Sequence, residues 1–344
     1  MKNKSFNIIV LILSTGIMFY FFIYSHGLES FIKQSKTLNK NWIIIAVFCI
    51  VLFWTFETII LHSITKALYA EHKLFLQSFK FTMIGQFFGA FTPFSSGSQP
   101  AQIYAMTETG IPAGSASSIL MIKFIIHEII YLVYLIIALL FKFNFFNARI
   151  KYFEYFCVIG TFVNISIILF ALMFSMNSKI SEKIIVGIFK ILSKIKLIKN
   201  VENKYNKIQV EIKKFHDNAA FIGKNKFTCF IASVFTLLQW LAYYIIPYCI
   251  YRSFGYTAAT IFTFITAQVF LTMFMSCIPL PGAEGGAEAG FYMIFGLFFK
   301  ANSIVSAIFI WRLITYYLTI AVGSIFTVIL PNTNIHKASS KNKN

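Results

Sequence analysis

Most of this chain consists of apolar runs long enough to cross a membrane as helices. Each run has roughly 20 residues or more without two-residue alternation, which favours α-helices over β-strands. Backbone polar groups in lipid must be satisfied within the protein, which also favours helices. We expect an all-α polytopic membrane protein with six full transmembrane helices at 6–24, 41–61, 117–140, 152–176, 227–251 and 303–330.

Two further apolar regions, 74–112 and 258–299, are interrupted by polar, Pro- and Gly-rich stretches. We call residues 92–100 break one and residues 279–288 break two. In each region the arm after the break is too short or too polar to cross a hydrocarbon core of about 30 Å. Paired breaks in two halves of a chain are typical of inverted-repeat transporters with a mid-membrane site. Both regions are therefore predicted to be re-entrant hairpins.

Composition and charge limit the function classes. Hydrophobic residues make up 58% of the chain and charged residues 12%, which excludes a soluble globule. The net charge of +18 does not indicate nucleic acid, because the basic residues lie between apolar runs. Segment 177–226 carries twelve Lys against four acidic residues and is predicted to be cytoplasmic, as are both termini. We expect a multi-pass protein of the bacterial cytoplasmic membrane.

Two opposed hairpins place both termini and 177–226 on the cytoplasmic side, put the basic segment of Lys142, Arg149 and Lys151 outside, and divide the chain into repeats. The expected organisation is an N-terminal membrane repeat with its hairpin, a cytoplasmic basic amphipathic linker, a C-terminal membrane repeat with its hairpin, and a cytoplasmic tail: 1–176 (hairpin 74–112), 177–226, 227–330 (hairpin 258–299) and 331–344. The linker has apolar residues at helical spacing, which fits helices on the leaflet surface or a solvated connecting helix.

Two cations lie inside apolar runs at nearly the same distance after the two breaks. Lys123 follows break one and Arg312 follows break two. A charge in a membrane helix is costly unless it is paired or hydrated. Both cations are predicted to face one central cavity and to bind a phosphate-bearing headgroup, since a guanidinium fork matches phosphate oxygens. Structural alternatives are a Lys–carboxylate pair that holds helices together, and Arg312 paired with Glu57, Glu284 or Glu288.

The breaks supply further candidates. The second arm of the first hairpin begins with four residues whose free backbone N–H groups are predicted to contribute to headgroup binding: Ser96, Gly97, Ser98 and Gln99. In the second hairpin, Glu288 is predicted in the first helical turn, where it satisfies the helix N-terminus or binds a cation. The candidate groups for cation or proton coupling are Glu288, Glu284, Glu128 and His127.

No enzyme motif, nucleotide fingerprint or metal-ligand cluster is recognisable. We therefore predict no catalytic residue, no metal and no cofactor. The expected partner is a membrane phospholipid or a polyprenyl-phosphate-linked lipid, with no nucleic acid. The sequence leaves the oligomeric state open.

Three motifs in order resemble those of the lysylphosphatidylglycerol synthase transmembrane (flippase-like) family. Gly85-Gln86-Phe87-Phe88, break one and Gln102-Ile103-Tyr104 are similar to its first signature. Break two resembles its second, a PGG-like loop closed by Glu. Trp311-Arg312-Leu313-Ile314-Thr315-Tyr316-Tyr317 resembles its Arg-bearing segment. Ser98 and Ala283 stand where the family usually has Gly, which puts the tightest loop conformations in question.

The resemblance implies a lipid-handling membrane protein. Because few residues follow the last predicted span, we expect the lipid-handling half without the soluble aminoacyl-transferase domain. The implied function is translocation or binding of a polar, anionic or aminoacylated lipid. Alternatives are a lipid-modifying transferase such as phosphatidylglycerol lysyltransferase, or a membrane subunit that recruits a partner through 177–226.

Overall fold

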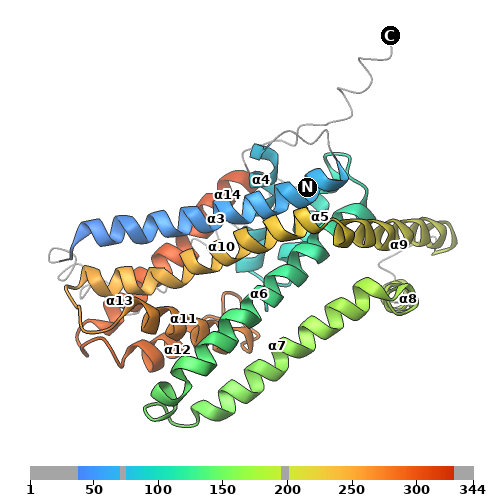
Figure 1. Ribbon diagram of the computed structural model, residues 1–344. Helices are drawn as coiled ribbons and strands as arrows, with labels where there is room; N and C mark the ends of the chain where they lie inside the picture. The colour runs from blue at the N-terminus through green and yellow to red at the C-terminus, as the bar shows by residue number, and fades with distance from the viewer. Residues whose placement is uncertain (1–37, 70–74, 195–200, 329–344) are drawn as a thin grey trace.

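The computed structural model describes residues 38–69, 75–194 and 201–328, and within these ranges the protein is helical (Figure 1). The helices are α3 (Lys40–Leu68), α4 (Phe75–Ala90), α5 (Ser98–Thr107), α6 (Ala113–Asn147), α7 (Phe153–Met176), α8 (Ser178–Lys194), α9 (Val201–Lys224), α10 (Lys226–Ser253), α11 (Ile261–Ser276), α12 (Gly286–Phe295), α13 (Ile304–Arg312), the π-helical turn η1 (Leu313–Tyr317) and α14 (Leu318–Val328). The all-α prediction is confirmed. The predicted span at 6–24 and the tail at 331–344 lie outside the described residues.

Five helical segments in the described chain are long and apolar enough to cross a membrane. They are α3, α6, α7, α10 and the continuous segment Ile304–Thr327 formed by α13, η1 and α14. Each covers one of the predicted spans, and the structure extends the span at 117–140 to Ala113–Asn147. The helical spans that the apolar pattern predicts between 41 and 328 are therefore present.

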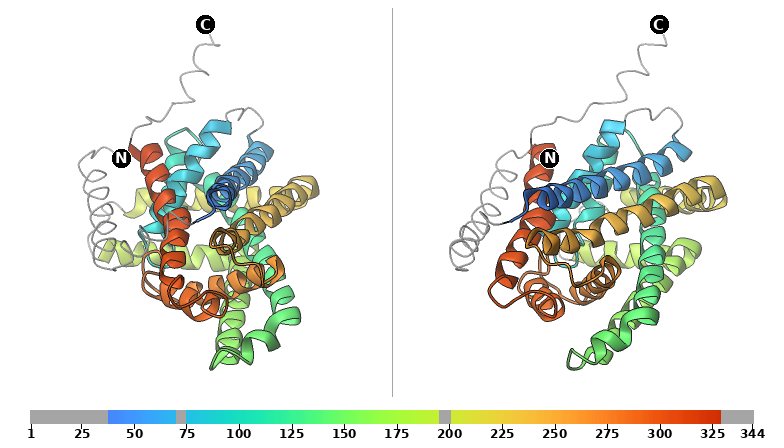
Figure 2. Two further views of the ribbon diagram at one scale, coloured as in Figure 1. Left: turned by 90° about the vertical axis from the view of Figure 1, so that its left-hand side faces the viewer. Right: turned by 60° about the vertical axis from the view of Figure 1, so that its left-hand side comes forward.

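Helices α3 and α10 run side by side along the molecule, as both views in Figure 2 show. Trp54 of α3 and Tyr244 of α10 are buried in the larger core cluster. This cluster continues into α11, α12 and α13 through packed aromatic rings, including Phe264, Phe291 and Trp311. A smaller cluster surrounds α5 and the first turns of α6. Aromatic packing thus joins the two halves of the chain.

Both interrupted regions fold as a helix, a break and a short helix. Helices α4 and α11 each have 16 residues, and α5 and α12 each have 10. At 1.5 Å per residue, a 10-residue helix is about 15 Å long, half of the hydrocarbon core. Neither α5 nor α12 can therefore cross a membrane alone. The two interrupted regions therefore match in helix length.

The predicted linker folds as two helices, α8 and α9, and α9 packs against the spanning helix α6. Ile212, Phe215 and Ile222 are buried. At the start of α6, the backbone N–H of Gly114 donates to the Glu211 carboxylate at 2.6 Å. A Cβ at Gly114 would lie 2.2 Å from the Glu211 carbonyl oxygen, so only glycine permits this approach. Helix α9 is therefore docked and is not a solvated connecting helix.

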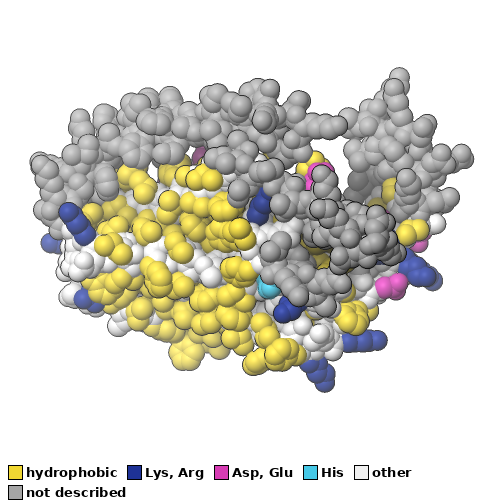
Figure 3. All heavy atoms as spheres, turned by 90° about the horizontal axis from the view of Figure 1, so that it is seen from above, with side chains coloured by type: hydrophobic (Ala, Val, Ile, Leu, Met, Phe, Trp, Pro, Cys, Tyr) yellow, Lys and Arg dark blue, Asp and Glu magenta, His cyan; other side chains and the backbone are white. Residues whose placement is uncertain are grey.

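The outer surface is that of a membrane protein. In Figure 3, hydrophobic side chains cover most of the described part of one face, and Lys and Arg lie mainly toward its ends. Exposed large apolar residues recur along several spanning helices, including Ile44, Phe48, Leu140, Phe162 and Phe170. Such continuous exposed apolar area is unusual for a soluble monomer.

Candidate functional site

The two breaks touch each other. Pro93 of break one and Pro281 of break two form an isolated antiparallel β-bridge, although they belong to opposite halves of the chain. Phe94 and Ser95 on one side and Ala283 on the other have positive φ angles of 53°, 54° and 51°. Non-glycine residues rarely adopt this conformation, and such strain gathers at functional sites. The sequence predicts both breaks, and the structure brings them into contact.

Arg312 is buried beside break two. Its Nε donates to Glu288 Oε1 at 2.5 Å, and its Nη1 donates to the carbonyl oxygen of Gly282 at 3.0 Å. Its side chain is 5% exposed and that of Glu288 is 17% exposed. Helix α12 begins at Gly286 and carries Glu288 in its first turn, as predicted. Of the three carboxylates considered as partners for Arg312, the structure selects Glu288.

This ion pair leaves polar atoms unused. Arg312 Nη2 and Glu288 Oε2 are both buried, and neither has a hydrogen-bond partner among the described residues. The guanidinium also lies 5.2 Å from the ring centroids of Trp311 and Tyr316. Buried polar groups are usually hydrogen-bonded, so this ion pair carries one unsatisfied donor and one unsatisfied acceptor.

Tyr316 links break two to the end of α4. It lies in the π-helical turn that directly follows Arg312, a feature often found at functional sites. Its hydroxyl is 3.2 Å from the carbonyl oxygen of Ala90, at the end of α4, and 3.5 Å from Glu284 Oε1. Gly282 has φ 58°, and a Cβ there would lie 2.4 Å from the Tyr316 ring. This glycine permits both the turn and the tyrosine.

A second buried ion pair involves Lys123. Its Nζ lies 2.6 Å from Glu57 Oε1, and the two side chains are 12% and 8% exposed. Gln86 Nε2 donates to Glu57 Oε2 at 2.6 Å, and Gln239 Nε2 approaches the same oxygen at 3.5 Å. The pair therefore joins α3, α4, α6 and α10. Lys123 and Arg312 thus bind different carboxylates, one in each half of the chain.

Glu57 is the residue that sequence reasoning missed as a site member. The sequence suggested it only as a possible partner of Arg312, whereas it binds Lys123. A single acidic residue within the apolar run 41–61 was an available signal, because such a residue needs a partner inside the membrane.

The candidate acid–base residues on α6, His127 and Glu128, contact α10 and α7. Glu128 meets α7, where Asn164 Nδ2 donates to its Oε2 at 2.9 Å. The His127 ring lies 4.6 Å from that of Trp240. Among the residues that the structure describes, no three His, Cys, Asp or Glu side chains are placed to hold a metal ion.

The prediction of free backbone N–H groups at break one is wrong for Ser96, Gly97 and Ser98. Their N–H groups donate to Pro93 O, Thr92 Oγ1 and Ser95 O at 3.1, 2.8 and 3.1 Å. The chain closes into tight turns that use these donors internally. The fourth predicted residue, Gln99, is placed by its side chain, which lines a cavity between α6 and α7.

The chain matches the family described as lysylphosphatidylglycerol synthase TM region over residues 7–323. It belongs to this family. A UPF0104 membrane protein of Archaeoglobus fulgidus is 24% identical over 309 residues, which cover 86% of this chain and 89% of that protein. Membership of the lysylphosphatidylglycerol synthase TM region family and the apolar helices establish a multi-pass membrane protein. The family name is consistent with a membrane lipid as partner.

Ser98 and Ala283, which stand where the lysylphosphatidylglycerol synthase TM region family usually has Gly, differ in backbone conformation. Ala283 has a positive φ of 51°, the conformation for which glycine is best suited. Ser98 is the first residue of α5 and is not among the positive-φ residues. Of these two replacements, Ala283 is the one that carries backbone strain.

Proposed function

We propose that this protein binds a polar membrane lipid at the contact between the two breaks and translocates its headgroup across the membrane. One observation carries the proposal: the breaks meet at Pro93 and Pro281 beside the buried Arg312–Glu288 pair, whose outer donor and acceptor are unused. In a membrane protein with paired helix breaks, such a place suits a substrate site.

The unused atoms support a lipid with an anionic or aminoacylated headgroup. Arg312 Nη2 offers N–H groups that suit a phosphate oxygen, and a guanidinium keeps its charge at any physiological pH. Glu288 Oε2 offers an acceptor for an ammonium group, such as that of an aminoacyl ester. A headgroup with both groups would satisfy both atoms together. Phosphatidylglycerol, its aminoacylated derivative and a polyprenyl-phosphate-linked lipid all carry the required phosphate.

The two ion pairs support a transport cycle. Lys123–Glu57 and Arg312–Glu288 lie one in each half and hold separate helices together. An incoming phosphate competes with the carboxylate for its cation, and the freed carboxylate can take a proton or another cation. Glu288, Glu284, Glu57, Glu128 and His127 are the proposed coupling groups. Exchange at the two pairs in turn would expose the site alternately to each leaflet.

Reconstituted vesicles test translocation directly. Vesicles containing the protein and phosphatidylglycerol with a fluorescent headgroup are treated with dithionite, which destroys only the label in the outer leaflet. We expect more label to be lost with wild type than with Arg312→Ala or with empty vesicles. Equal loss for wild type, the variant and empty vesicles would exclude translocation of this lipid under these conditions.

The proposed setting is the bacterial cytoplasmic membrane with both termini cytoplasmic. The exposed residues Lys224 and Lys300 serve as reporters of this orientation. In a background without native cysteine, Lys300→Cys in intact cells should react with an impermeant thiol reagent and Lys224→Cys should not. The reverse labelling would refute the orientation.

A further inference from the structure

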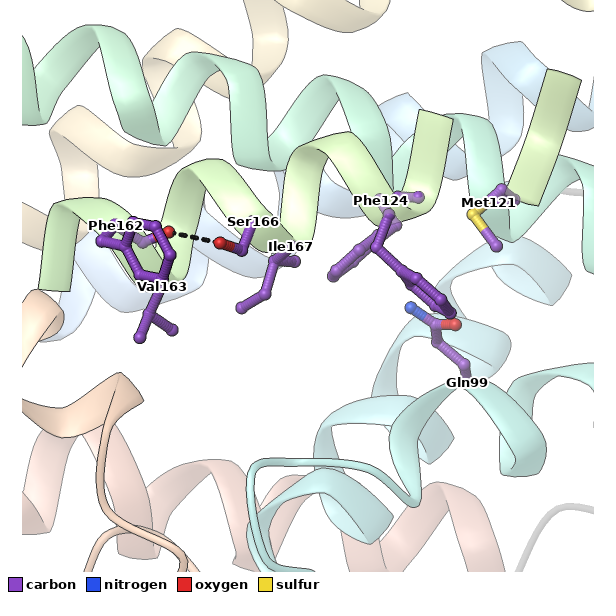
Figure 4. A pocket seen from close by; sticks show the side chains of 9 residues that line it. Gln99, Met121, Phe124, Phe162, Val163, Ser166 and Ile167 are labelled. Carbon is purple, nitrogen blue, oxygen red and sulfur yellow. Dashed lines mark hydrogen bonds between the residues drawn. The ribbon is translucent and has the colours of Figure 1, made fainter. Parts of the chain in front are cut away.

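An open cavity of about 540 Å³ lies between α6 and α7 (Figure 4). Phe124 contributes to it from α6, and Val163 and Ile167 contribute from α7. Gln99, in the first turn of α5, closes one end with its amide group. The volume falls within the range of about 300–1,000 Å³ typical of ligand sites.

The chemistry of the walls selects an apolar occupant with a polar group at one end. Ser166 also lines the cavity, but its hydroxyl donates to the Phe162 carbonyl oxygen of its own helix at 2.8 Å. The Gln99 amide is then the polar side-chain group left to the cavity. A water-filled or ionic site would need several polar partners. The lining therefore fits hydrocarbon, with a hydrogen-bonding group near Gln99.

The cavity opens between two helices that are predicted to face the lipid bilayer. Helices α6 and α7 are both long and apolar enough to span a membrane. At the edge of the cavity, Phe162 is 71% exposed and Phe170 is 58% exposed. In a bilayer, the medium that meets this opening is the hydrocarbon of lipid tails. The cavity thus continues the lipid-facing surface of the protein.

The polar end of the cavity lies at break one. Gln99 belongs to break one, which contacts break two at Pro93 and Pro281. The ester region of a phospholipid joins tail to headgroup, and its carbonyl oxygens accept hydrogen bonds. A lipid with its esters at Gln99 would place its headgroup toward the breaks and one tail along Val163 and Ile167.

We propose that the α6–α7 cavity is a lateral seat for one acyl chain of the transported lipid, with Gln99 donating to an ester carbonyl. The inference rests on the proposed function and adds the route by which the lipid enters, which is sideways between α6 and α7. The tail then stays in hydrocarbon while the headgroup moves.

The test compares chain length with headgroup in one titration. Purified protein in a fixed concentration of mild detergent is titrated with dipalmitoyl phosphatidylglycerol and with dioctanoyl phosphatidylglycerol, which differ in chain length. Dipalmitoyl phosphatidylcholine gives the comparison of headgroups, and thermophoresis measures the binding. Ile167→Trp fills the cavity. Leu169→Trp is the matched control, because Leu169 lies on the same helix, is 56% exposed and does not line the cavity. Val163→Phe is a second, smaller filling, and thermal melting checks that each variant folds.

Wild type and Leu169→Trp should bind the dipalmitoyl lipid at least roughly tenfold more tightly than the dioctanoyl lipid, since burying two methylenes is worth about that factor. In Ile167→Trp and Val163→Phe this ratio should fall to about twofold, with the preference for phosphatidylglycerol over phosphatidylcholine retained. Folded filling variants that keep the wild-type ratio would overturn the acyl-chain seat and leave the headgroup site standing. A wild type without headgroup preference would overturn the proposed function and this inference with it.

Discussion

Pro93 and Pro281 form an antiparallel bridge that joins the two interrupted hairpins at their breaks. Proline has no N–H and a fixed φ, so neither residue can continue a regular helix, and the contact lies in irregular backbone after α4 and α11. Arg312 and Tyr316 then bind both sides of this contact, Arg312 through Gly282 and Tyr316 through Ala90. The contact between the two breaks is therefore made of irregular backbone next to these two side chains.

The acids of break two should differ in importance. Glu288 pairs with the buried Arg312, whereas the Glu284 carboxylate accepts a 3.5 Å hydrogen bond from the Tyr316 hydroxyl. Glu288→Gln removes the charge that compensates a buried guanidinium and should cost roughly 1.5–3 kcal/mol of stability. The matched variant Glu284→Gln should cost less than about 1 kcal/mol. Thermal unfolding in detergent measures both, and equal losses would contradict the assigned pairing.

The Lys123–Glu57 pair should behave as one unit. Removing either charge alone leaves the other buried and unpaired, so Lys123→Met or Glu57→Gln should each cost about 3–5 kcal/mol. Carrying both changes together should cost less than the sum, since the remaining groups are neutral. A double-mutant cycle on thermal stability measures this coupling. Strictly additive losses would show that the two residues do not depend on each other.

Ala283 offers a stabilising change. Its φ of 51° costs an alanine roughly 1–2 kcal/mol more than a glycine, partly offset by the greater freedom of glycine in the unfolded chain. Ala283→Gly should therefore stabilise the protein by up to about 1 kcal/mol. Ala289→Gly, at an exposed position within α12, should instead destabilise it by about 1 kcal/mol. Melting temperatures that fall equally in both variants would refute the strained turn.

The α6–α9 contact should weaken in acid. Burial acts to raise the pKa of Glu211, but the Gly114 N–H and the Lys214 ammonium outweigh it, so the pKa lies below its ordinary value of 4.5. A lowered pKa means that the carboxylate stabilises docking above pH 4.5 and that this contribution is lost as the pH falls through the folded-state pKa. Between pH 5 and 8 the contact should not change.

A spin label on α9 reports this docking. Val210 is 54% exposed and can carry the label without disturbing the buried face of the helix. In wild type its mobility should rise only below about pH 4.5, the ordinary value for this carboxyl. In Glu211→Gln, whose amide oxygen still accepts from Gly114, mobility should be independent of pH over this range. A wild-type rise between pH 7 and 5 would show that another group controls the contact.

The sequence predicts what depends on local pattern. Apolar runs predict the spans between 41 and 328, and the start of α12 with Glu288 in its first turn follows from Gly285 and Gly286. The lengths of α5 and α12 follow from the breaks. Whether the hairpins are re-entrant stays a prediction, as does the orientation of the chain in the membrane.

Features that depend on contacts between distant residues could not be predicted from the sequence. Nothing near Pro93 indicates that it meets Pro281, and nothing near Glu57 selects Lys123 over Arg312. Nor does the sequence around break one show that the Thr92 hydroxyl folds back to accept from the Gly97 N–H, because this hydrogen bond depends on the shape of the turn. The π-helical turn after Arg312 has no recognisable local signal.

Equilibrium binding by variants of Arg312 tests the central claim most directly. Arg312→Lys keeps the charge but loses the planar fork that binds Glu288 and Gly282 and that we propose also binds a phosphate. Losing one charge-assisted hydrogen bond should weaken binding of phosphatidylglycerol by roughly ten- to a hundredfold, with phosphatidylcholine as the reference lipid. Arg149→Lys, at an exposed arginine, is the matched control and should bind like wild type. If folded Arg312→Lys also binds phosphatidylglycerol like wild type, the headgroup does not bind at Arg312.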